Sequence, residues 1–174
     1  LEAEEALEGR ARAMGPEPDE AGIDEDEQPR QDEEPLAVER GFGDGGDDTQ
    51  ARLVTALVGG VHVVSAYVPN GQEIGSDKWD YKVEWMKRLR AWLDRRFAKS
   101  DLVALCGDFN VAPDDRDVHD PALWRGRNLA SEPERDRLGA LIDTGLVDLG
   151  RDAAGDVTGP FTFWDYRMGA FHRG

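Results

Sequence analysis

The chain has 174 residues, enough for one domain with a sizeable core. Its formal net charge of −16 is uneven, because residues 1–39 hold 15 Asp and Glu against 3 Lys and Arg, whereas residues 40–174 hold 22 against 18. Net charge therefore neither supports nor excludes a nucleic-acid partner for the second part. No apolar stretch approaches the ~20 residues that cross a bilayer. The first residues are acidic, unlike a signal peptide, so we predict a soluble, cytoplasmic protein.

Residues 1–35 are rich in acids, Pro and Gly, and poor in apolar residues. Such a segment cannot bury enough apolar surface to offset the entropy lost on ordering. We predict a disordered acidic tail over 1–35, followed by a folded domain over 36–174. An interaction tail, a dispensable solvated tail and a faulty gene start stay open as explanations of the tail. The single cysteine, Cys106, lies in an apolar run, and we expect it in the core.

Residues 52–58 and 61–68 are β-rich runs joined by Gly59-Gly60, which predicts a tight hairpin. Both runs are apolar on both faces, so we expect a sheet that is covered on both sides.

A helix is predicted over residues 78–98, followed by a strand over 101–107, a helix over 133–145 and a last strand over 161–166. The first helix has an apolar stripe made of Trp79, Val83, Met86, Leu89 or Arg90, Leu93 and Phe97. Its polar face holds Lys82, Lys87, Arg88, Arg95 and Arg96. In the second helix Leu138, Leu141 and Ile142 face the core. This β-β-α-β-α-β order predicts a layered α/β fold.

The strand over 101–107 leads into Gly107-Asp108-Phe109-Asn110, which brings a carboxylate and an amide to one edge of a sheet. Residues i and i+2 of an extended chain point the same way, so Asp108 and Asn110 would converge on one spot. The carboxylate can take a proton from water or help to hold a divalent cation, and the amide can orient an anion. An ordinary turn after a strand explains the same four residues equally well.

Two further segments carry groups that suit phosphate and sugar. Tyr67 ends a strand and Asn70 lies in the turn that follows, so a phenol and an amide could contact phosphate oxygens. Phe163, Trp164 and Arg167 could wall a sugar pocket and pair with phosphate. Taken one at a time, a core tyrosine and an aromatic core strand are the simpler explanations.

Together these segments resemble the exonuclease III family of abasic-site endonucleases, within the endonuclease/exonuclease/phosphatase superfamily. The resemblance runs from about residue 35 to residue 174, and its matching segments are 49–52, 66–71, 105–113, 146–149 and 163–167. Gly-Asp-x-Asn is common to the superfamily, whereas Tyr-Val-Pro-Asn-Gly and Trp-Asp-Tyr-Arg point to its nuclease branch. The implied fold is the central part of a four-layer α/β sandwich, with two mixed sheets face to face and helices outside.

The resemblance also implies roles for individual residues. Asp108 corresponds to the aspartate that activates the attacking water beside the metal, and Asn110 to the asparagine that orients water or phosphate. Both are candidate metal ligands, and Tyr67 is the candidate tyrosine that contacts phosphate. Lys82 matches a recurrent family lysine, to which we give a supporting role. The implied DNA-contacting positions are Arg52, Asn70, Phe163, Trp164 and Arg167.

The implied activity is Mg²⁺-dependent hydrolysis of double-stranded DNA 5′ to abasic sites and from 3′ ends by a monomer, with Mn²⁺ as an alternative metal. The family's first strand with its metal-binding glutamate, and its final Arg-Ile-Asp and Ser-Asp-His motifs, have no counterpart in this sequence. We therefore expect weak Mg²⁺ binding and no efficient activity from this chain alone. A partial DNA-repair nuclease, another phosphodiesterase of the superfamily and a non-catalytic fragment or binding module all stay open.

Overall fold

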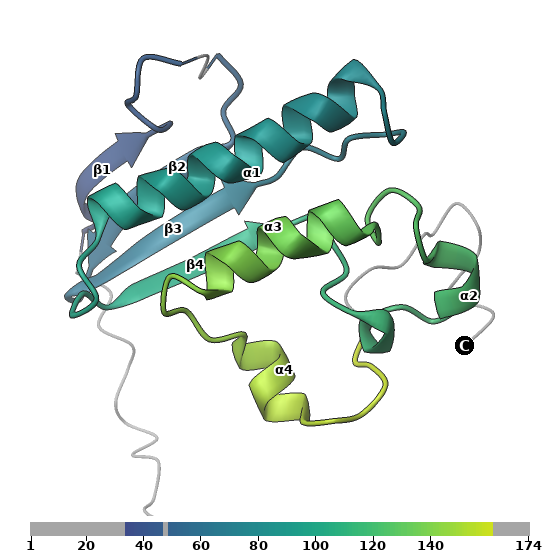
Figure 1. Ribbon diagram of the computed structural model, residues 1–174. Coiled ribbons are helices and arrows are strands. Elements are labelled where there is room, and N and C mark those ends of the chain that lie inside the picture. The colour runs from purple at the N-terminus through teal and green to yellow at the C-terminus, as the bar shows by residue number, and fades with distance from the viewer. Residues whose placement is uncertain (1–33, 47–48, 162–174) are drawn as a thin grey trace, which may run out of the picture. The chain divides into compact units, whose positions relative to one another are not determined.

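The computed structural model describes residues 34–46 and 49–161. A four-stranded sheet has the order β1 (Leu36–Arg40), β2 (Leu53–Val58), β3 (Val61–Tyr67) and β4 (Val103–Asp108). The helices are α1 (Asp77–Arg96), α2 (Pro121–Trp124), α3 (Glu132–Ile142) and α4 (Leu149–Ala154), with a 3-10 turn η1 (Asp115–Asp117). Figure 1 shows α1 and α3 side by side across one face of the sheet. The predicted α/β class is confirmed, whereas β1 and the short helices were not predicted.

The sheet combines a hairpin with a parallel crossover. Gly59 and Gly60 have φ values of 55° and 82°, and they join β2 to β3 as the predicted tight hairpin. Helix α1 then carries the chain back, so that β4 pairs parallel with β3. Within the described residues Phe161 is outside any strand, and the rest of the strand predicted over 161–166 lies outside the described part.

Helix α1 starts where the sequence favours a helix. The Ser76 side chain caps it by accepting from the N–H of Trp79. In its last turn the positive charges of Arg95 and Arg96 lie at the negative end of the helix dipole. Its buried face packs on β3, where Val64 and Ala66 are buried. Each fully buried aliphatic side chain contributes roughly 1.5–3 kcal/mol.

The predicted faces of the two long helices needed correction. Trp85 and Trp92 are buried on α1, and so is Lys82, which was assigned to the polar face. On α3, Leu138 and Leu141 face the core as predicted, whereas Ile142 is 37% exposed. The lysine is buried because it has charged and polar partners inside, which a hydrophobic periodicity cannot register.

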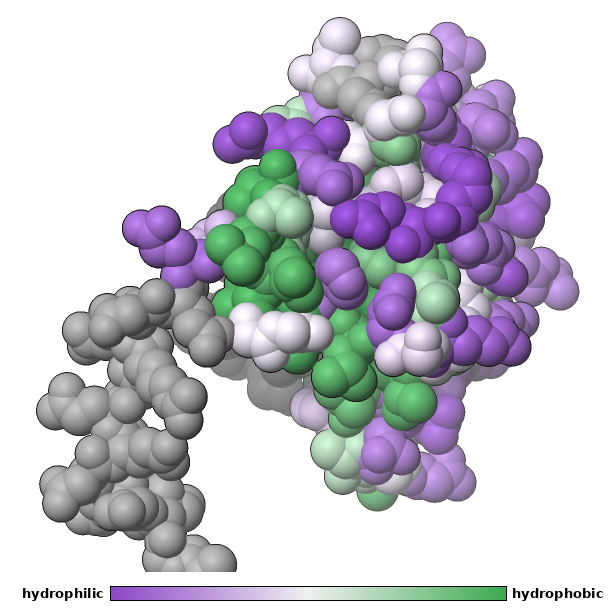
Figure 2. All heavy atoms as spheres, turned by 90° about the vertical axis from the view of Figure 1, so that its left-hand side faces the viewer, coloured by the Kyte–Doolittle hydropathy of each residue, from purple (hydrophilic) through white to green (hydrophobic). Residues whose placement is uncertain are grey.

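The prediction that both faces of the sheet are covered is wrong for the described part of the chain. The helix-free face exposes apolar side chains on two strands, Val38 on β1 and Val54 and Val58 on β2. Cys106, which was expected in the core, is exposed on β4. Figure 2 shows apolar residues gathered between hydrophilic ones on the side where β1 lies. Both faces of the sheet are therefore apolar as predicted, but among the described elements only one face is packed, against α1 and α3.

An exposed Cys106 predicts rapid reaction with a thiol reagent. We expect the native chain to be labelled within about tenfold of its rate in concentrated urea, since no unfolding step is required. The rate should not change with protein concentration if the chain is a monomer. Labelling slower by several orders of magnitude would show that this face is covered.

The close approach of β3 and β4 at Gly107 gives a second prediction. Gly107 has φ 130°, and an added Cβ would lie 1.9 Å from the carbonyl oxygen of Ala66. We expect Gly107→Ala to lower the free energy of unfolding by more than about 3 kcal/mol. Gly139→Ala is the matched control, because a Cβ there meets nothing within 4 Å. It should be neutral or stabilise α3 by up to about 1 kcal/mol. Urea unfolding measures both, and equal effects would contradict the steric argument.

Candidate active site

The parallel strands β3 and β4 end together, and their last residues carry two of the predicted site residues. Tyr67 pairs in register with Asp108, so their side chains leave the same face of the sheet. The N–H of Val68 donates to the carbonyl of Asp108 at 2.9 Å and closes the last link between the strands. Tyr67 is 49% exposed, which excludes the alternative of a buried core tyrosine.

Asn110 is held against both strand ends. Its N–H donates to Oδ1 of Asp108 at 2.9 Å, and its Nδ2 donates to the carbonyl of Val68 at 2.9 Å. Asn110 therefore meets Asp108 through its backbone N–H, whereas its side-chain amide contacts Val68 and Asn70. That the carboxylate and the side-chain amide act on one spot stays a prediction, and the extended geometry assumed for it is wrong. Asn110 has φ 49°, a left-handed rather than an extended conformation.

Asn70, in the turn after β3, extends this network. Its Nδ2 donates to Oδ1 of Asn110 at 3.1 Å, and its own Oδ1 accepts from the N–H of Gln72 at 3.1 Å and from Nδ2 of Asn128 at 3.2 Å. Asn128 was not predicted as a site residue. Its Oδ1 is buried and has no hydrogen-bond partner among the described residues. Three amide side chains from three loops therefore meet beside the carboxylate of Asp108.

Lys82 lies beneath these amides. Its side chain is 0% exposed, and its Nζ donates to the carbonyls of Asn110 at 2.7 Å and Asn70 at 3.3 Å. It also forms a buried ion pair with Glu134 of α3. Burial lowers the pKa of the Lys82 ammonium below its usual range, while Glu134 and, to a smaller extent, Asp108 act in the opposite direction.

Glu134 is placed by the start of α3. Its carboxylate accepts from the N–H of Ser131, which is one arm of a capping box, from the Ser131 hydroxyl, and from the N–H of Leu129 at 3.2 Å. Sequence reasoning missed this residue. The signal for its local role was present, because Ser131 and Glu134 have the spacing of a capping box at the start of a helix. Nothing local pointed to a partner on α1.

Arg52 lies just before β2 and beside Tyr67. Its Nη1 donates to the Tyr67 carbonyl at 3.3 Å, its Nε donates to Oε1 of Gln50 at 2.7 Å, and its guanidinium carbon lies 4.9 Å from the Tyr67 ring centroid. The structure thus brings together Arg52, Tyr67, Asn70, Asp108 and Asn110. The other predicted contacts, Phe163, Trp164 and Arg167, lie outside the described residues.

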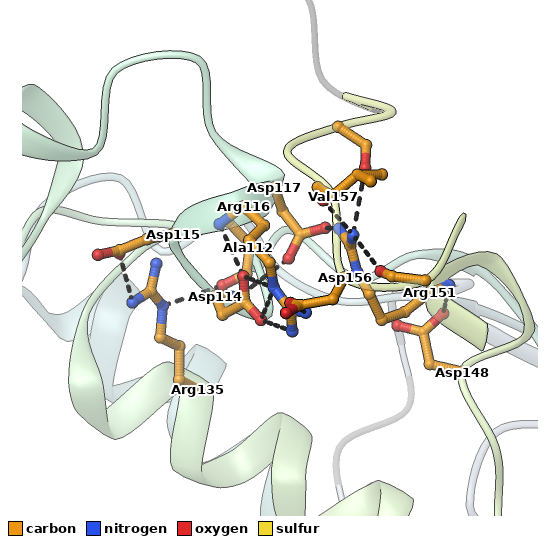
Figure 3. A network of polar contacts seen from close by, with 12 residues as sticks. Ala112, Asp114, Asp115, Arg116, Asp117, Arg135, Asp148, Arg151, Asp156 and Val157 are labelled. Carbon is orange, nitrogen blue, oxygen red and sulfur yellow. Dashed lines mark hydrogen bonds and ion pairs between the residues drawn. The ribbon is translucent and has the colours of Figure 1, made fainter. Parts of the chain in front are cut away.

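Figure 3 shows how charged residues fix the loop that leaves Asn110. Arg135 of α3 donates to the Ala112 carbonyl at 3.1 Å and to Asp115 at 3.0 Å. Arg116 binds both oxygens of Asp114 and reaches Asp156 at 2.7 Å. These contacts join the loop to α3 and to the segment after α4.

Arg151 of α4 completes this anchor. It pairs with Asp117 and donates to the carbonyls of Val157 at 2.8 Å and Gly159 at 3.2 Å. A hydrogen bond from Arg116 lowers the pKa of Asp114, and hydrogen bonds from Arg125 and Arg135 lower that of Asp115. Asp114 and Asp115 therefore favour the ionised form, and Asp114, Asp115 and Asp117 are all engaged with arginines. Asp108 is the carboxylate at the strand ends.

Comparison with known proteins decides the family. The model of the endonuclease/exonuclease/phosphatase family matches residues 33–174. The chain belongs to this family. It is 32% identical to the exodeoxyribonuclease of Bacillus subtilis over 141 residues, which is 81% of this chain and 55% of that protein. It is 36% identical to the DNA repair nuclease APEX1 of Danio rerio over 137 residues, which is 79% of this chain and 44% of that protein.

Solved structures agree with this assignment. An AP endonuclease from Archaeoglobus fulgidus superposes with a TM-score of 0.75 at 34% identity, covering 81% of this chain and 55% of that one. The 3′ phosphatase NExo from Neisseria, bound to a product DNA hairpin, gives 0.74 at 33% identity with the same coverage. The chain therefore has the family's fold over its described part, and it spans about half the length of the relatives it matches.

The donor set of this family member fits a divalent cation only in part. Asp108 has one carboxylate oxygen that accepts from Asn110, so its second oxygen can face a cation. The amide oxygen of Asn110 accepts from Asn70, which leaves it one lone pair. The described residues contain no group of three or more His, Cys, Asp or Glu that could hold a metal. Mg²⁺ would need further oxygens from substrate phosphate, water or other residues.

The exposed Tyr67 phenol gives a test that separates function from stability. No hydrogen bond of its hydroxyl is found among the described residues, and its ring is half exposed. We expect Tyr67→Phe to change the free energy of unfolding by less than about 0.5 kcal/mol. Because the substitution removes one donor, weaker phosphate binding at unchanged stability would assign the hydroxyl a role in binding. A loss above 1 kcal/mol in urea unfolding would instead assign the hydroxyl a structural role.

Proposed function

We propose that this chain forms the DNA-contacting half of a Mg²⁺-dependent phosphodiesterase that cleaves double-stranded DNA 5′ to abasic sites and at 3′ ends. One observation carries the proposal. Tyr67 and Asp108 end two parallel strands in register, and Asn110 is hydrogen-bonded to Asp108 and Asn70 at the same edge. Hydrogen-bond donors placed beside one carboxylate can bind the oxygens of a phosphodiester while the carboxylate contacts the attacking water.

Each group has a part in the proposed reaction. Asp108 would accept a proton from the water that attacks phosphorus, and Asn110 would orient that water or a phosphate oxygen. Tyr67 would donate to a phosphate oxygen, and Arg52 and Asn70 would contact the DNA backbone. A divalent cation held by Asp108, with Asn110 beside it, would supply charge stabilisation on the phosphate oxygens. Mg²⁺ is the proposed metal, with Mn²⁺ as an alternative.

We also infer that the open face of the sheet is covered by a second sheet in the complete four-layer sandwich. Its exposed residues Val38, Val54 and Val58 have the β-branched apolar character of a sheet-packing surface. The relatives are about twice as long as the aligned region, which leaves ample chain for such a layer. The monomeric state and the cytoplasmic location stay predictions.

A binding experiment with the 174-residue chain tests the proposed site. The probes are Mg²⁺ and a duplex that carries a tetrahydrofuran abasic-site analogue, followed by NMR of the backbone amides. Shifts should concentrate at residues 67–70 and 107–110. Asp108→Asn should remove the Mg²⁺-dependent shifts, because it deletes the one carboxylate at the strand ends, whereas Asp136→Asn on the exposed face of α3 should keep them. Shifts centred elsewhere would contradict the proposal.

The same samples are assayed for incision with Mg²⁺ and with EDTA. We expect cleavage that is far slower than that of full-length relatives, is abolished by EDTA and requires Asp108. A rate equal to that of the relatives would contradict a half-site. Tight duplex binding with no effect of Mg²⁺ would favour a non-catalytic binding module, and cleavage of phosphodiesters other than DNA would favour a different substrate.

A further inference from the structure

The ammonium of Lys82 connects two loops of the proposed site to α3. Its acceptors are the carbonyls of Asn70 and Asn110 and the carboxylate of Glu134, one acceptor for each of its three N–H bonds. No solvent reaches the side chain. All of its hydrogen-bonding capacity is therefore used to hold specific protein groups.

Its most consequential acceptor is Asn110. The left-handed φ of 49° is unfavourable for a residue other than glycine, so it persists only where contacts hold it. The peptide N–H of Asn110 is fixed by Asp108, and its carbonyl is fixed by Lys82. With both peptide groups held, the amide side chain is aimed at Val68 and Asn70.

Glu134 gives the ammonium its counter-charge without touching the two loops itself. It is held by the N–H and hydroxyl of Ser131 and by the N–H of Leu129. Lys82 and Glu134 therefore have separable effects. Glu134 compensates the buried charge, whereas the N–H groups of Lys82 orient the loop carbonyls.

We propose that Lys82 is a positioning residue for Asn110 and Asp108, and that Glu134 serves as its counter-ion. This inference rests on the proposed function for its effect on catalysis. The effect on Asn110 itself is independent of any reaction, so the two can be tested apart.

Four variants of the 174-residue chain separate positioning from stability. Lys82→Met and Glu134→Gln each leave one buried charge without a partner, and both should lower the melting temperature markedly. The double variant K82M/E134Q removes both charges and keeps an acceptor for the capping box, so its melting temperature should recover most of the loss. Lys87→Met is the control, because Lys87 lies on the same helix in an exposed pair with Glu84.

The decisive measurement is amide hydrogen exchange of Asn110, with the NMR shifts of its side-chain NH₂ group. In K82M/E134Q we expect exchange at Asn110 to accelerate about 10-fold or more while core amides of β3 keep their protection. In Glu134→Gln, the exchange rate at Asn110 should rise less although the fold is less stable, because the Lys82 donors remain. If the double variant regains wild-type exchange protection at Asn110 together with its melting temperature, Lys82 has only a structural role and the proposal fails.

Incision of the abasic-site duplex is the second readout. We expect K82M/E134Q to lower kcat by about 10- to 100-fold with KM changed less than about 3-fold, and Glu134→Gln to lower kcat less. A wild-type chain that neither cleaves nor shows Mg²⁺-dependent shifts would overturn the proposed function. The exchange data would then still decide whether Lys82 positions Asn110.

Discussion

A buried ammonium sets the strongest constraint on this structure. An unpaired charge in a protein interior costs several kcal/mol, so Lys82 can be fully buried only if acceptors are in place around it. Those acceptors lie 12, 28 and 52 positions away along the chain, in Asn70, Asn110 and Glu134. The turn after β3, the loop after β4 and the start of α3 must therefore form together. This couples the folding of the core to the geometry of the site.

The same ion pair limits what electrostatics can contribute to binding DNA. Glu134 neutralises Lys82, and the aspartates of the loop after Asn110 are paired with Arg116 of that loop, Arg135 of α3 and Arg151 of α4. Such internally paired charges give little long-range attraction for a polyanion. The described site thus offers hydrogen-bond donors, the guanidinium of Arg52 and one carboxylate rather than an extended basic surface. Under the proposed function, a divalent cation would have to balance much of the phosphate charge at Asp108.

The sequence predicted the local parts of this arrangement. Gly59-Gly60 encodes the hairpin because both residues tolerate positive φ, and an apolar strand running into Asp108 places that carboxylate at a sheet edge. The burial of Lys82 was not predictable from periodicity, since lysine is mostly exposed and its partner Glu134 is distant in sequence. The register that pairs Tyr67 with Asp108 also depends on how α1 packs, and a local pattern does not contain it.

Two errors had the same physical origin. Cys106 and the valines of β2 look like core residues because their neighbours are apolar, but burial requires a second layer as well as suitable composition. The described residues supply that layer on one face of the sheet and not on the other. Apolar alternation along a strand therefore predicts that a face can pack, and only the tertiary structure shows what packs on it.

The polar network of the site lies within the described residues 70–134. Asn70 hydrogen-bonds both Asn110 and Asn128, and Lys82, paired with Glu134, donates to the backbone carbonyls of Asn70 and Asn110. These hydrogen bonds hold Asn70 and Asn110 in place before any partner binds. Among the described residues, Asp108 is the carboxylate at the strand ends, and no group of three or more His, Cys, Asp or Glu could hold a metal. Under the proposed function, residues outside the described part would supply the further metal ligands and so govern metal affinity. The described residues already set the positions of Tyr67, Asn110 and Asp108.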